Sequence, residues 1–250
     1  FSESLRLIYF PNTHFSAFVL IFILIMIILI ASLLMFKYHV EGETNLPFEL
    51  KKINVISTAE SSITQDEEDI WHAGILQKND IFFVIEKNDE YKKDEAIKKI
   101  SFENFVIIKT NENMVVDIYK PTTSINTYNY SEEYKIQNLE YVGGQSTNTE
   151  TLQINNQGGL IGFSVTSGNL GEYIFSENEK LPSDGRLLEK AGIKAEDMNF
   201  NISFDLIIET ESNHKFKANI TLDLPTGNIL QDGVGTLEDT ELTNVIFKRF

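Results

Sequence analysis

Cysteine is absent from all 250 residues of the chain. Its absence excludes disulfides, thiolate catalysis, iron–sulfur clusters and cysteine-ligated zinc. The redox compartment stays open, because a chain without cysteine suits both a bacterial cell exterior and a reducing cytosol. Histidine is also scarce, and none of the four forms the i,i+4 pair with a glutamate that zinc hydrolases use: His14, His39, His72 and His214. We therefore predict no metal site, and expect these histidines to lie at the surface or in local hydrogen bonds.

Basic side chains are in the minority, with 21 Lys and Arg against 37 Asp and Glu and a formal net charge of −16. Such a chain is repelled by phosphate backbones and by anionic lipid headgroups. We therefore expect no nucleic-acid partner. The excess negative charge is more simply explained as a property that keeps the charged part of the chain in solution.

Catalytic signatures are missing as well. The sequence has no G-x-S-x-G elbow and no serine–lysine motif. The glycine-rich run GGLIGF, Gly158–Phe163, superficially resembles a phosphate-binding loop, but no Lys-Ser/Thr follows it and no strand–loop–helix pattern surrounds it. Glycines that permit a bulge or close sheet packing are the favoured interpretation. We assign no catalytic, cofactor-binding or metal residue and expect neither an enzyme nor a cofactor.

Three polar or aromatic features can be explained either by a purely structural role or by a role in binding. The acidic run Asp66–Asp69 offers oxygens for calcium but lacks the ligand spacing and central glycine of a calcium loop, which favours an exposed acidic loop. Asn79-Asp80 and Asn88-Asp89 are a weak cation site or ordinary turn chemistry, and the latter is simpler. Trp71, the sole tryptophan, is a binding platform if exposed and a core anchor if buried; burial is favoured.

An uncharged apolar run, FSAFVLIFILIMIILIASLLMF, occupies Phe15–Phe36. At the α-helical rise of about 1.5 Å per residue it spans about 33 Å, which matches the hydrocarbon core of a bilayer. A buried core helix would keep a polar stripe, and a cleaved signal peptide has a shorter apolar region and a cleavage site that is missing before Lys37. We predict an uncleaved signal-anchor that contacts the lipid bilayer through residues 15–36.

The orientation of this anchor is less clear from the sequence. Arg6 precedes the helix, whereas Lys37, Lys51 and Lys52 follow it, and this count alone places the large domain in the cytoplasm. Long domains, however, translocate largely regardless of charge. The sequence also begins at Phe1 rather than at Met, so the count of basic residues ahead of the helix is a lower bound. We therefore expect the C-terminal domain on the extracytoplasmic side.

Hydrophobic periodicity beyond the anchor is that of strands. The strongest signal is strict alternation from Phe200 to Ile208 and from Phe216 to Leu224, which predicts a long antiparallel hairpin turning around Ser212–His214. Further strands are expected, in chain order, at Leu50–Val55, Ile81–Glu86, Phe102–Lys109, Val115–Tyr119, Glu133–Val142, Leu152–Ile154, around Gly158–Val165, at Tyr173–Phe175 and at Leu242–Phe250.

Two short helices are expected among these strands. Over Glu90–Ile100, acid-before-base pairs at i,i+4 favour a helix, with Asp94 before Lys98 as one example. A second helix is expected over Asp184–Ala191, ended by Gly192. The predicted fold class is mainly β: an antiparallel β-sandwich-like domain with one or two short helices, preceded by a single transmembrane α-helix.

The expected domain organisation has four parts: a juxtamembrane segment at 1–14, the transmembrane helix at 15–37, a tether at 38–47 and the β-rich domain at 48–250. The β-rich part is one domain, or two lobes that meet near residues 143–150, where Gly143-Gly144 and a polar run follow each other. The turn-rich tract 122–129 separates two of the expected strands.

Three segments beyond the anchor, NLPFELKKINVISTAE, IQNLEY…NNQGGLIGF and FDLIIETESNHKFKANITLDLPTGNI, give the chain a resemblance to a known group. With its anchor, it resembles uncharacterised single-pass membrane proteins of anaerobic Gram-positive bacteria. The resemblance implies a bacterial source and this membrane topology. It implies no activity and no site residues.

From these observations we expect a membrane-anchored, non-enzymatic structural or interaction module of a bacterial cell envelope, with other envelope proteins as partners. The alternative is a membrane-tethered module that binds or senses a small ligand, a wall polymer or a cation. An enzyme is the third and least supported option, because no catalytic pattern is present.

Overall fold

The computed structural model describes residues 13–121, 130–144, 152–182 and 184–250. The chain divides into two compact units, Phe1–Thr44 and Asn45–Phe250. The second unit is mainly β and consists of two antiparallel sheets, which confirms the predicted fold class. The expected lobe boundary at 143–150 falls within this second unit, and most of it lies outside the described residues.

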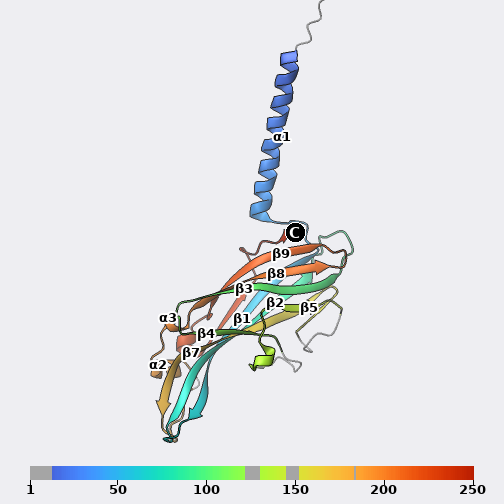
Figure 1. Ribbon diagram of the computed structural model, residues 1–250. Helices are drawn as coiled ribbons and strands as arrows, with labels where there is room; N and C mark the ends of the chain where they lie inside the picture. Colours follow the sequence, from blue (N-terminus) through green and yellow to red (C-terminus); the bar gives the residue numbers. More distant parts are fainter. Residues whose placement is uncertain (1–12, 122–129, 145–151, 183) are drawn as a thin grey trace, which may run out of the picture. The chain divides into compact units, whose positions relative to one another are not determined.

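The first unit contains α1, which runs from Thr13 to Glu41 (Figure 1). Its part from Phe18 to Glu41 is long and apolar enough to cross a membrane, and none of its most apolar stretch is buried against protein. The helix continues past the apolar run predicted from the sequence, by about one turn in which the Lys37 ammonium lies 3.6 Å from the Glu41 carboxylate. The structure thus contains a helix that could anchor the protein in a membrane.

The larger sheet has six strands among the described residues, in the order β10-β1-β2-β7-β4, with β6 paired to the edge of β7. These strands are β1 (Phe48–Gln65), β2 (Trp71–Lys87), β4 (Val115–Tyr119), β6 (Gln153–Asn155), β7 (Gly158–Phe175) and β10 (Val234–Asp239). Every pairing is antiparallel.

The smaller sheet has five strands in the order β11-β9-β8-β3-β5. They are β3 (Ile97–Lys109), β5 (Leu139–Val142), β8 (Phe200–Thr210), β9 (Lys215–Leu224) and β11 (Lys248–Arg249). The β8–β9 hairpin matches the prediction from period-2 alternation, because Phe200 pairs with Leu224 and Ile208 with Phe216. The final strand is shorter than expected: of Leu242–Phe250 only two residues form β11, which does join the sheet of β9.

A cluster of aromatic rings holds the two sheets together. Phe83 and Phe163 come from the larger sheet, and Phe102 and Phe204 come from the smaller one. All four side chains are fully buried, and the Phe102 ring centroid lies 4.9 Å from that of Phe83 and 5.2 Å from that of Phe163. Large buried rings in tilted and edge-to-face contact supply much of the apolar area that folding removes from water.

Four short helices complete the β-rich unit among the described residues: η1 (Glu132–Tyr134), α2 (Arg186–Lys190), α3 (Ala195–Met198) and α4 (Ile229–Asp232). The expected helix over Asp184–Ala191 corresponds to α2, and Gly192 follows it with a φ of 69°, which suits a residue without a Cβ. Leu188 of α2 and Met198 of α3 are fully buried, so these helices contribute to the core.

The helix expected over Glu90–Ile100 is wrong. This segment is a turn followed by β3, which begins at Ile97. The lysines find their acids on neighbouring strands instead of one helical turn away: the Lys98 ammonium lies 2.6 Å from the Glu209 carboxylate, and that of Lys99 lies 2.6 Å from Glu140. These lysines do form ion pairs with acids, but the pairs join neighbouring strands and not successive turns of a helix.

Two other expectations need correction. The strand expected over Glu133–Val142 is a turn of 3-10 helix, η1, followed by the much shorter β5. The turn-rich tract 122–129 and the polar run after Gly144 lie outside the described residues. The expected short strands at Leu50–Val55 and Ile81–Glu86 belong to β1 and β2, which pair along their whole length from Phe48 with Lys87 to Gln65 with Trp71.

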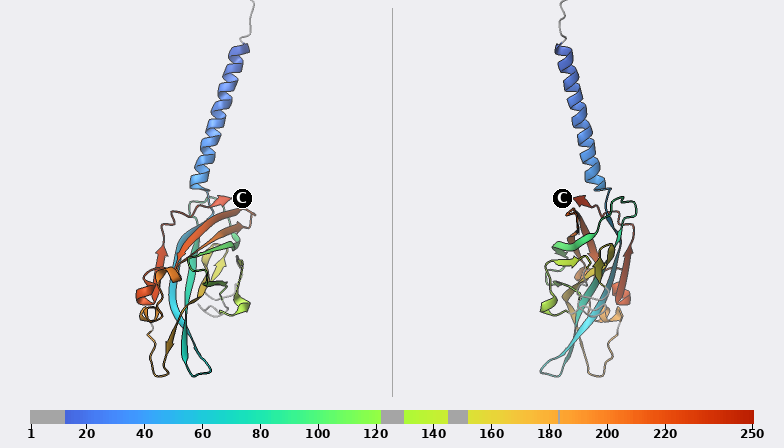
Figure 2. Two further views of the ribbon diagram at one scale, coloured as in Figure 1. Left: turned by 60° about the vertical axis from the view of Figure 1, so that its left-hand side comes forward. Right: turned by 90° about the vertical axis from the view of Figure 1, so that its right-hand side faces the viewer.

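The long β1–β2 hairpin is joined on its β2 side by the second half of β7, where Trp71 pairs with Phe175. The ends of these three strands project together past the rest of the β-rich unit, at the lower end of Figure 1 and in both views of Figure 2. We call this projection the finger. Because β1 starts at Phe48, the finger lies at the opposite end of β1 from the point where the chain enters the domain.

Candidate functional site

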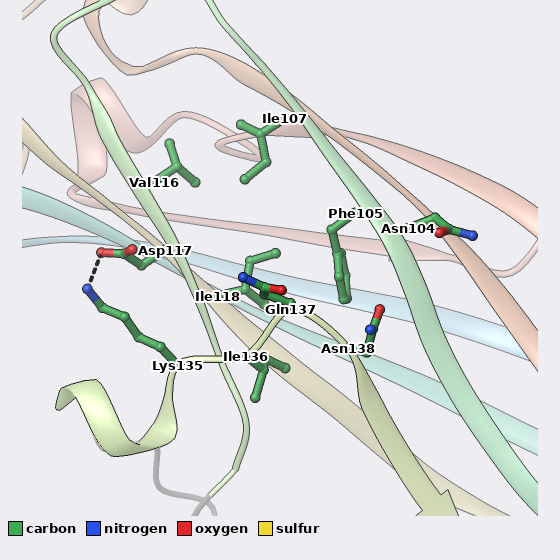
Figure 3. Close-up of a pocket in the computed structure, with 10 residues that line it drawn as sticks. All are labelled: Asn104, Phe105, Ile107, Val116, Asp117, Ile118, Lys135, Ile136, Gln137 and Asn138. Atoms are coloured by element: carbon green, nitrogen blue, oxygen red, sulfur yellow. Dashed lines mark ion pairs between the residues drawn. The ribbon is translucent and has the colours of Figure 1, made fainter.

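A cleft of about 740 Å³ lies between the two sheets of the β-rich unit (Figure 3). Its lining combines apolar and amide side chains with one ion pair: Asn104, Phe105, Ile107, Val116, Asp117, Ile118, Lys135, Ile136, Gln137 and Asn138. Binding pockets for small molecules typically have volumes of about 300–1,000 Å³ and mostly apolar walls with a few polar groups. The cleft has such a volume, but its ten lining residues divide evenly into five apolar and five polar side chains.

The cleft exists because the strands of the two sheets, as far as the structure describes them, end there without closing. β4 is the edge strand of the larger sheet, and β5 covers the edge of β3 only from Lys99 to Phe102. The chain after η1 crosses part of the gap, where the Ile136 amide donates to the Ile118 carbonyl over 2.9 Å. The remaining edge of β3, from Asn104 onward, borders the cleft.

Apolar side chains from both sheets face each other across the cleft. Ile107 comes from β3, whereas Val116 and Ile118 come from β4. Figure 3 shows Ile107 and Val116 on opposite walls, with Phe105 and Ile136 further along. Ile118 is buried, but Ile107, Val116, Phe105 and Ile136 are only half-buried, so part of the interface between the sheets is open to solvent.

The polar groups of the cleft lie at its rim. The Lys135 ammonium is 3.1 Å from the Asp117 carboxylate and 2.6 Å from that of Glu132. These two hydrogen-bonded carboxylates, Glu132 first, raise the pKa of Lys135, which keeps it charged and unsuited to act as a nucleophile. The amide of Asn104, at a β3 bulge with a φ of 56°, donates to Asp205 over 2.9 Å. Lys135 and Asn104 are therefore both already engaged by carboxylates of the protein.

A second hollow, of about 440 Å³, lies on the outer face of the larger sheet beside Tyr130. The Lys78 ammonium lies 4.4 Å from the centroid of the Tyr130 ring, and the Ser164 hydroxyl donates to the Asp80 carboxylate over 2.6 Å. Burial raises the pKa of Asp80 and that of the Tyr130 phenol. These groups are mutually paired, so the hollow offers a ligand few unsatisfied polar partners.

The tip of the finger brings together three features that the sequence presented separately. The acidic run Asp66–Asp69 forms the turn between β1 and β2, and Trp71 and His72 begin β2. His72 lies between two carboxylates, with Nδ1 3.1 Å from Glu172 and Nε2 3.2 Å from Asp66. Those hydrogen bonds, Glu172 first, raise the pKa of His72. Trp71 is half-buried, so it is neither the free platform nor the core anchor that we considered.

The other residues singled out in the sequence lie apart. Asn79 faces the core and accepts a hydrogen bond from Ser57 over 2.7 Å, whereas Asn88 holds the turn after β2 by donating to the Leu46 carbonyl. The Asn79-Asp80 and Asn88-Asp89 pairs therefore make no common cation site. His214 lies in the β8–β9 turn beside Ser212. The run Gly158–Phe163 is part of β7, with no helix after it.

No metal-binding cluster of three or more His, Asp or Glu side chains occurs within the described parts of the chain. Sequence reasoning missed the cleft altogether. Its residues belong to strands that were largely predicted, but only the pairing of those strands shows that β3 and β4 leave an open side. The one available signal was the run FVII at Phe105–Ile108, where four apolar residues in a row break the alternation of a one-sided strand.

Comparison with known proteins gives no match: no protein-family model, no curated protein and no solved structure resembles this chain significantly. The resemblance to single-pass membrane proteins of Gram-positive bacteria therefore stays an expectation from the sequence.

Proposed function

We propose that this chain is a membrane-anchored, non-enzymatic interaction module of a bacterial cell envelope, with its β-rich domain on the extracytoplasmic side. The proposal is supported by the open cleft, which apolar side chains line in part, in a domain that follows a helix able to span a membrane after only a few residues. A cleft between two sheet edges with apolar groups in its lining favours insertion of an extended segment from a second envelope protein, because strand edges and apolar pockets are the two elements of strand addition.

The lining of the cleft supports binding over catalysis. Lys135 is tied up in ion pairs, and the amides of Asn104, Gln137 and Asn138 offer hydrogen bonds without acid–base chemistry.

The absence of cysteine makes the compartment directly testable. A Glu112→Cys variant places a single thiol in the exposed turn between β3 and β4, and Ser2→Cys places one before the helix. We expect an impermeant maleimide to label intact cells at position 112 and to label position 2 only after lysis. Labelling at position 2 alone would reverse the orientation and replace the envelope module by a cytosolic scaffold.

The cleft itself is tested with two neighbouring residues of β3 that face opposite ways. Ile107 lines the cleft, whereas Val106 lies outside its lining and is half-exposed to solvent. With a benzophenone attached to Ile107→Cys, we expect a discrete cross-linked product in cells that Val106→Cys does not give. A Val116→Phe substitution, which fills the cleft, should abolish that product at unchanged abundance. Equal products from both positions would refute a role for the cleft.

A small apolar ligand is the second candidate, favoured by the cleft volume of about 740 Å³. Native mass spectrometry of the purified full chain distinguishes the two. A discrete mass adduct that Val116→Phe removes, without any protein cross-link at Ile107→Cys, would favour the ligand.

A further inference from the structure

The tip of the finger is a second surface, remote from the cleft. It consists of residues 61–75, which form the end of the β1–β2 hairpin, and residues 170–177, which hold the end of β7. None of its residues lines the cleft. Two properties occur together on this surface, exposed apolar side chains and charge of one sign.

Apolar side chains cover both faces of the tip. On the face that continues the core-facing side of the sheet, Ile63 is 51% exposed beside the half-buried ring of Trp71. The Trp71 ring centroid lies 6.2 Å from that of Phe175, its partner on β7. On the opposite face Ile174 is 59% exposed, and Ile70 at the turn is 37% exposed. Apolar groups are thus exposed on both faces of the hairpin end.

Every fully charged group of the tip is acidic. Residues 61–75 and 170–177 contain six carboxylates and no Lys or Arg, for a formal charge of −6 with His72 neutral: Asp66, Glu67, Glu68, Asp69, Glu172 and Glu177. Elsewhere in the domain acids and lysines often pair across strands, as Lys99 does with Glu140. Within the tip only His72 pairs with carboxylates, those of Asp66 and Glu172, and from outside it the Lys190 ammonium lies 4.9 Å from the centroid of the Tyr173 ring.

The geometry of the tip is fixed by internal hydrogen bonds. The Asp66 carboxylate accepts from the amides of Glu68 and Ile70, both at 2.9 Å, and Gln65 donates to Asp69 over 3.1 Å. His72 ties the hairpin to β7 through its contacts with Asp66 and Glu172. A rigid surface loses little conformational entropy when a partner binds. Glu67 and Glu68 stay exposed beside this fixed turn.

We propose that the tip is a docking surface for a cationic segment of another protein, one whose lysines or arginines alternate with apolar side chains. Charge complementarity selects the cationic partner, because like charges repel nucleic acid and anionic lipid surfaces from a patch of −6. The exposed apolar groups select a polypeptide with apolar side chains over a simple cation, since burying them contributes affinity that charge alone does not.

The test uses Trp71, the single tryptophan of the chain, as a reporter placed within the tip. The full chain is reconstituted in nanodiscs of phosphatidylcholine, a zwitterionic lipid that does not attract cationic peptides. The probe is a ten-residue peptide of alternating lysine and leucine. We expect a saturable change in Trp71 fluorescence whose affinity falls as salt rises. A lysine–serine peptide should bind more weakly, and a glutamate–leucine peptide should not bind.

Matched variants separate the tip from the bulk charge of the chain. Glu67→Gln with Glu68→Gln removes two exposed carboxylates of the tip, whereas Glu112→Gln with Glu211→Gln removes two exposed carboxylates elsewhere. Because exposed ion pairs contribute little individually, the tip variant should weaken binding about threefold to tenfold. The control variant should change the affinity less than twofold, an estimate for remote screened charges.

The contribution of the apolar side chains to binding is tested with a second pair of variants, both on β1. Ile63→Thr removes an exposed apolar group of the tip, and Ile56→Thr removes one that is 40% exposed outside it. Both replacements keep a β-branched side chain, so folding is expected to persist. Weaker binding for Ile63→Thr alone supports the proposal. Equal effects of tip and control variants, or equal binding of the lysine–leucine and lysine–serine peptides, would overturn it.

Discussion

Tyr141 offers the sharpest test of how the two sheets are joined. It belongs to β5 in the smaller sheet, yet its hydroxyl donates to the Gly162 carbonyl of β7 over 2.6 Å and accepts from the Gly162 amide over 3.2 Å. On that edge of β7, β6 pairs with Gly158–Leu160 and β4 pairs with Ser164–Gly168. The hydroxyl thus takes the place of a strand in the gap between them.

Replacement of Tyr141 by Phe removes one oxygen and leaves both buried backbone groups of Gly162 without a partner. Each unsatisfied buried group destabilises a fold by about 1–3 kcal/mol, so we expect a loss of about 2–6 kcal/mol in the free energy of unfolding for the two groups. For a domain of this size that corresponds to a fall in Tm of about 4–24 °C. The ring itself stays, so no cavity contributes to the loss.

The measurement is urea unfolding of the full chain in detergent micelles, followed by far-ultraviolet circular dichroism. Tyr91→Phe is the control, because its hydroxyl has no hydrogen-bond partner among the described residues. We expect a lower midpoint for Tyr141→Phe with an unchanged m-value. A loss below about 0.5 kcal/mol, the usual range of surface substitutions, would refute the reasoning.

Three further predictions concern the core, the tip and an edge strand. Phe102→Ala, which empties a site among four aromatic rings, should lower the free energy of unfolding by about 3–5 kcal/mol in chemical denaturation. His72 should titrate above its ordinary pKa of 6.5 by NMR, and Glu172→Gln should lower that pKa. Because the folded-state pKa is raised, its stabilising effect is fully present below about pH 6.5 and is lost as the pH rises through the folded-state pKa. Gly235→Ala should speed amide exchange in β10, since its Cβ would lie 1.7 Å from a backbone oxygen, whereas Gly168→Ala meets nothing within 4 Å.

The sequence predicts those elements whose side chains follow one period without interruption. The anchor helix has an unbroken apolar run, and the β8–β9 hairpin alternates strictly because one face of it is buried throughout. In such segments hydrophobic periodicity and burial carry the same information. Their existence and pairing were therefore accessible without coordinates.

The second half of β1 and the first half of β2, which pair toward the tip, could not be recognised as strands from periodicity. Their core-facing positions include Ser57, Gln77 and Asn79, all buried, so the apolar alternation stops where the strands continue. These groups bond mainly to one another and to the backbone, as when Gln77 donates to Asn79 over 3.2 Å. Such a buried polar cluster, in which the Gln77 side-chain oxygen has no hydrogen-bond partner among the described residues, leaves no periodic signal in a single sequence.

The open cleft and the tip could not be predicted from the sequence for a different reason. Both depend on which strands become neighbours, and register between distant strands is not a local property. The acidic run before Trp71 was visible as a surface loop, but Glu172, more than 100 positions later, becomes its neighbour only because β7 pairs with β2. The charge of the tip is thus a product of topology.

The course of β1 has a mechanical consequence. This one strand carries the chain from Phe48, where it enters the domain, to Gln65 within the tip, a length of about 60 Å at about 3.3 Å per residue. If α1 spans a membrane and the tip binds a partner as proposed, tension between the two loads the covalent backbone of β1, which is already extended. That load passes along β1 itself and not through the side-chain packing that joins the two sheets.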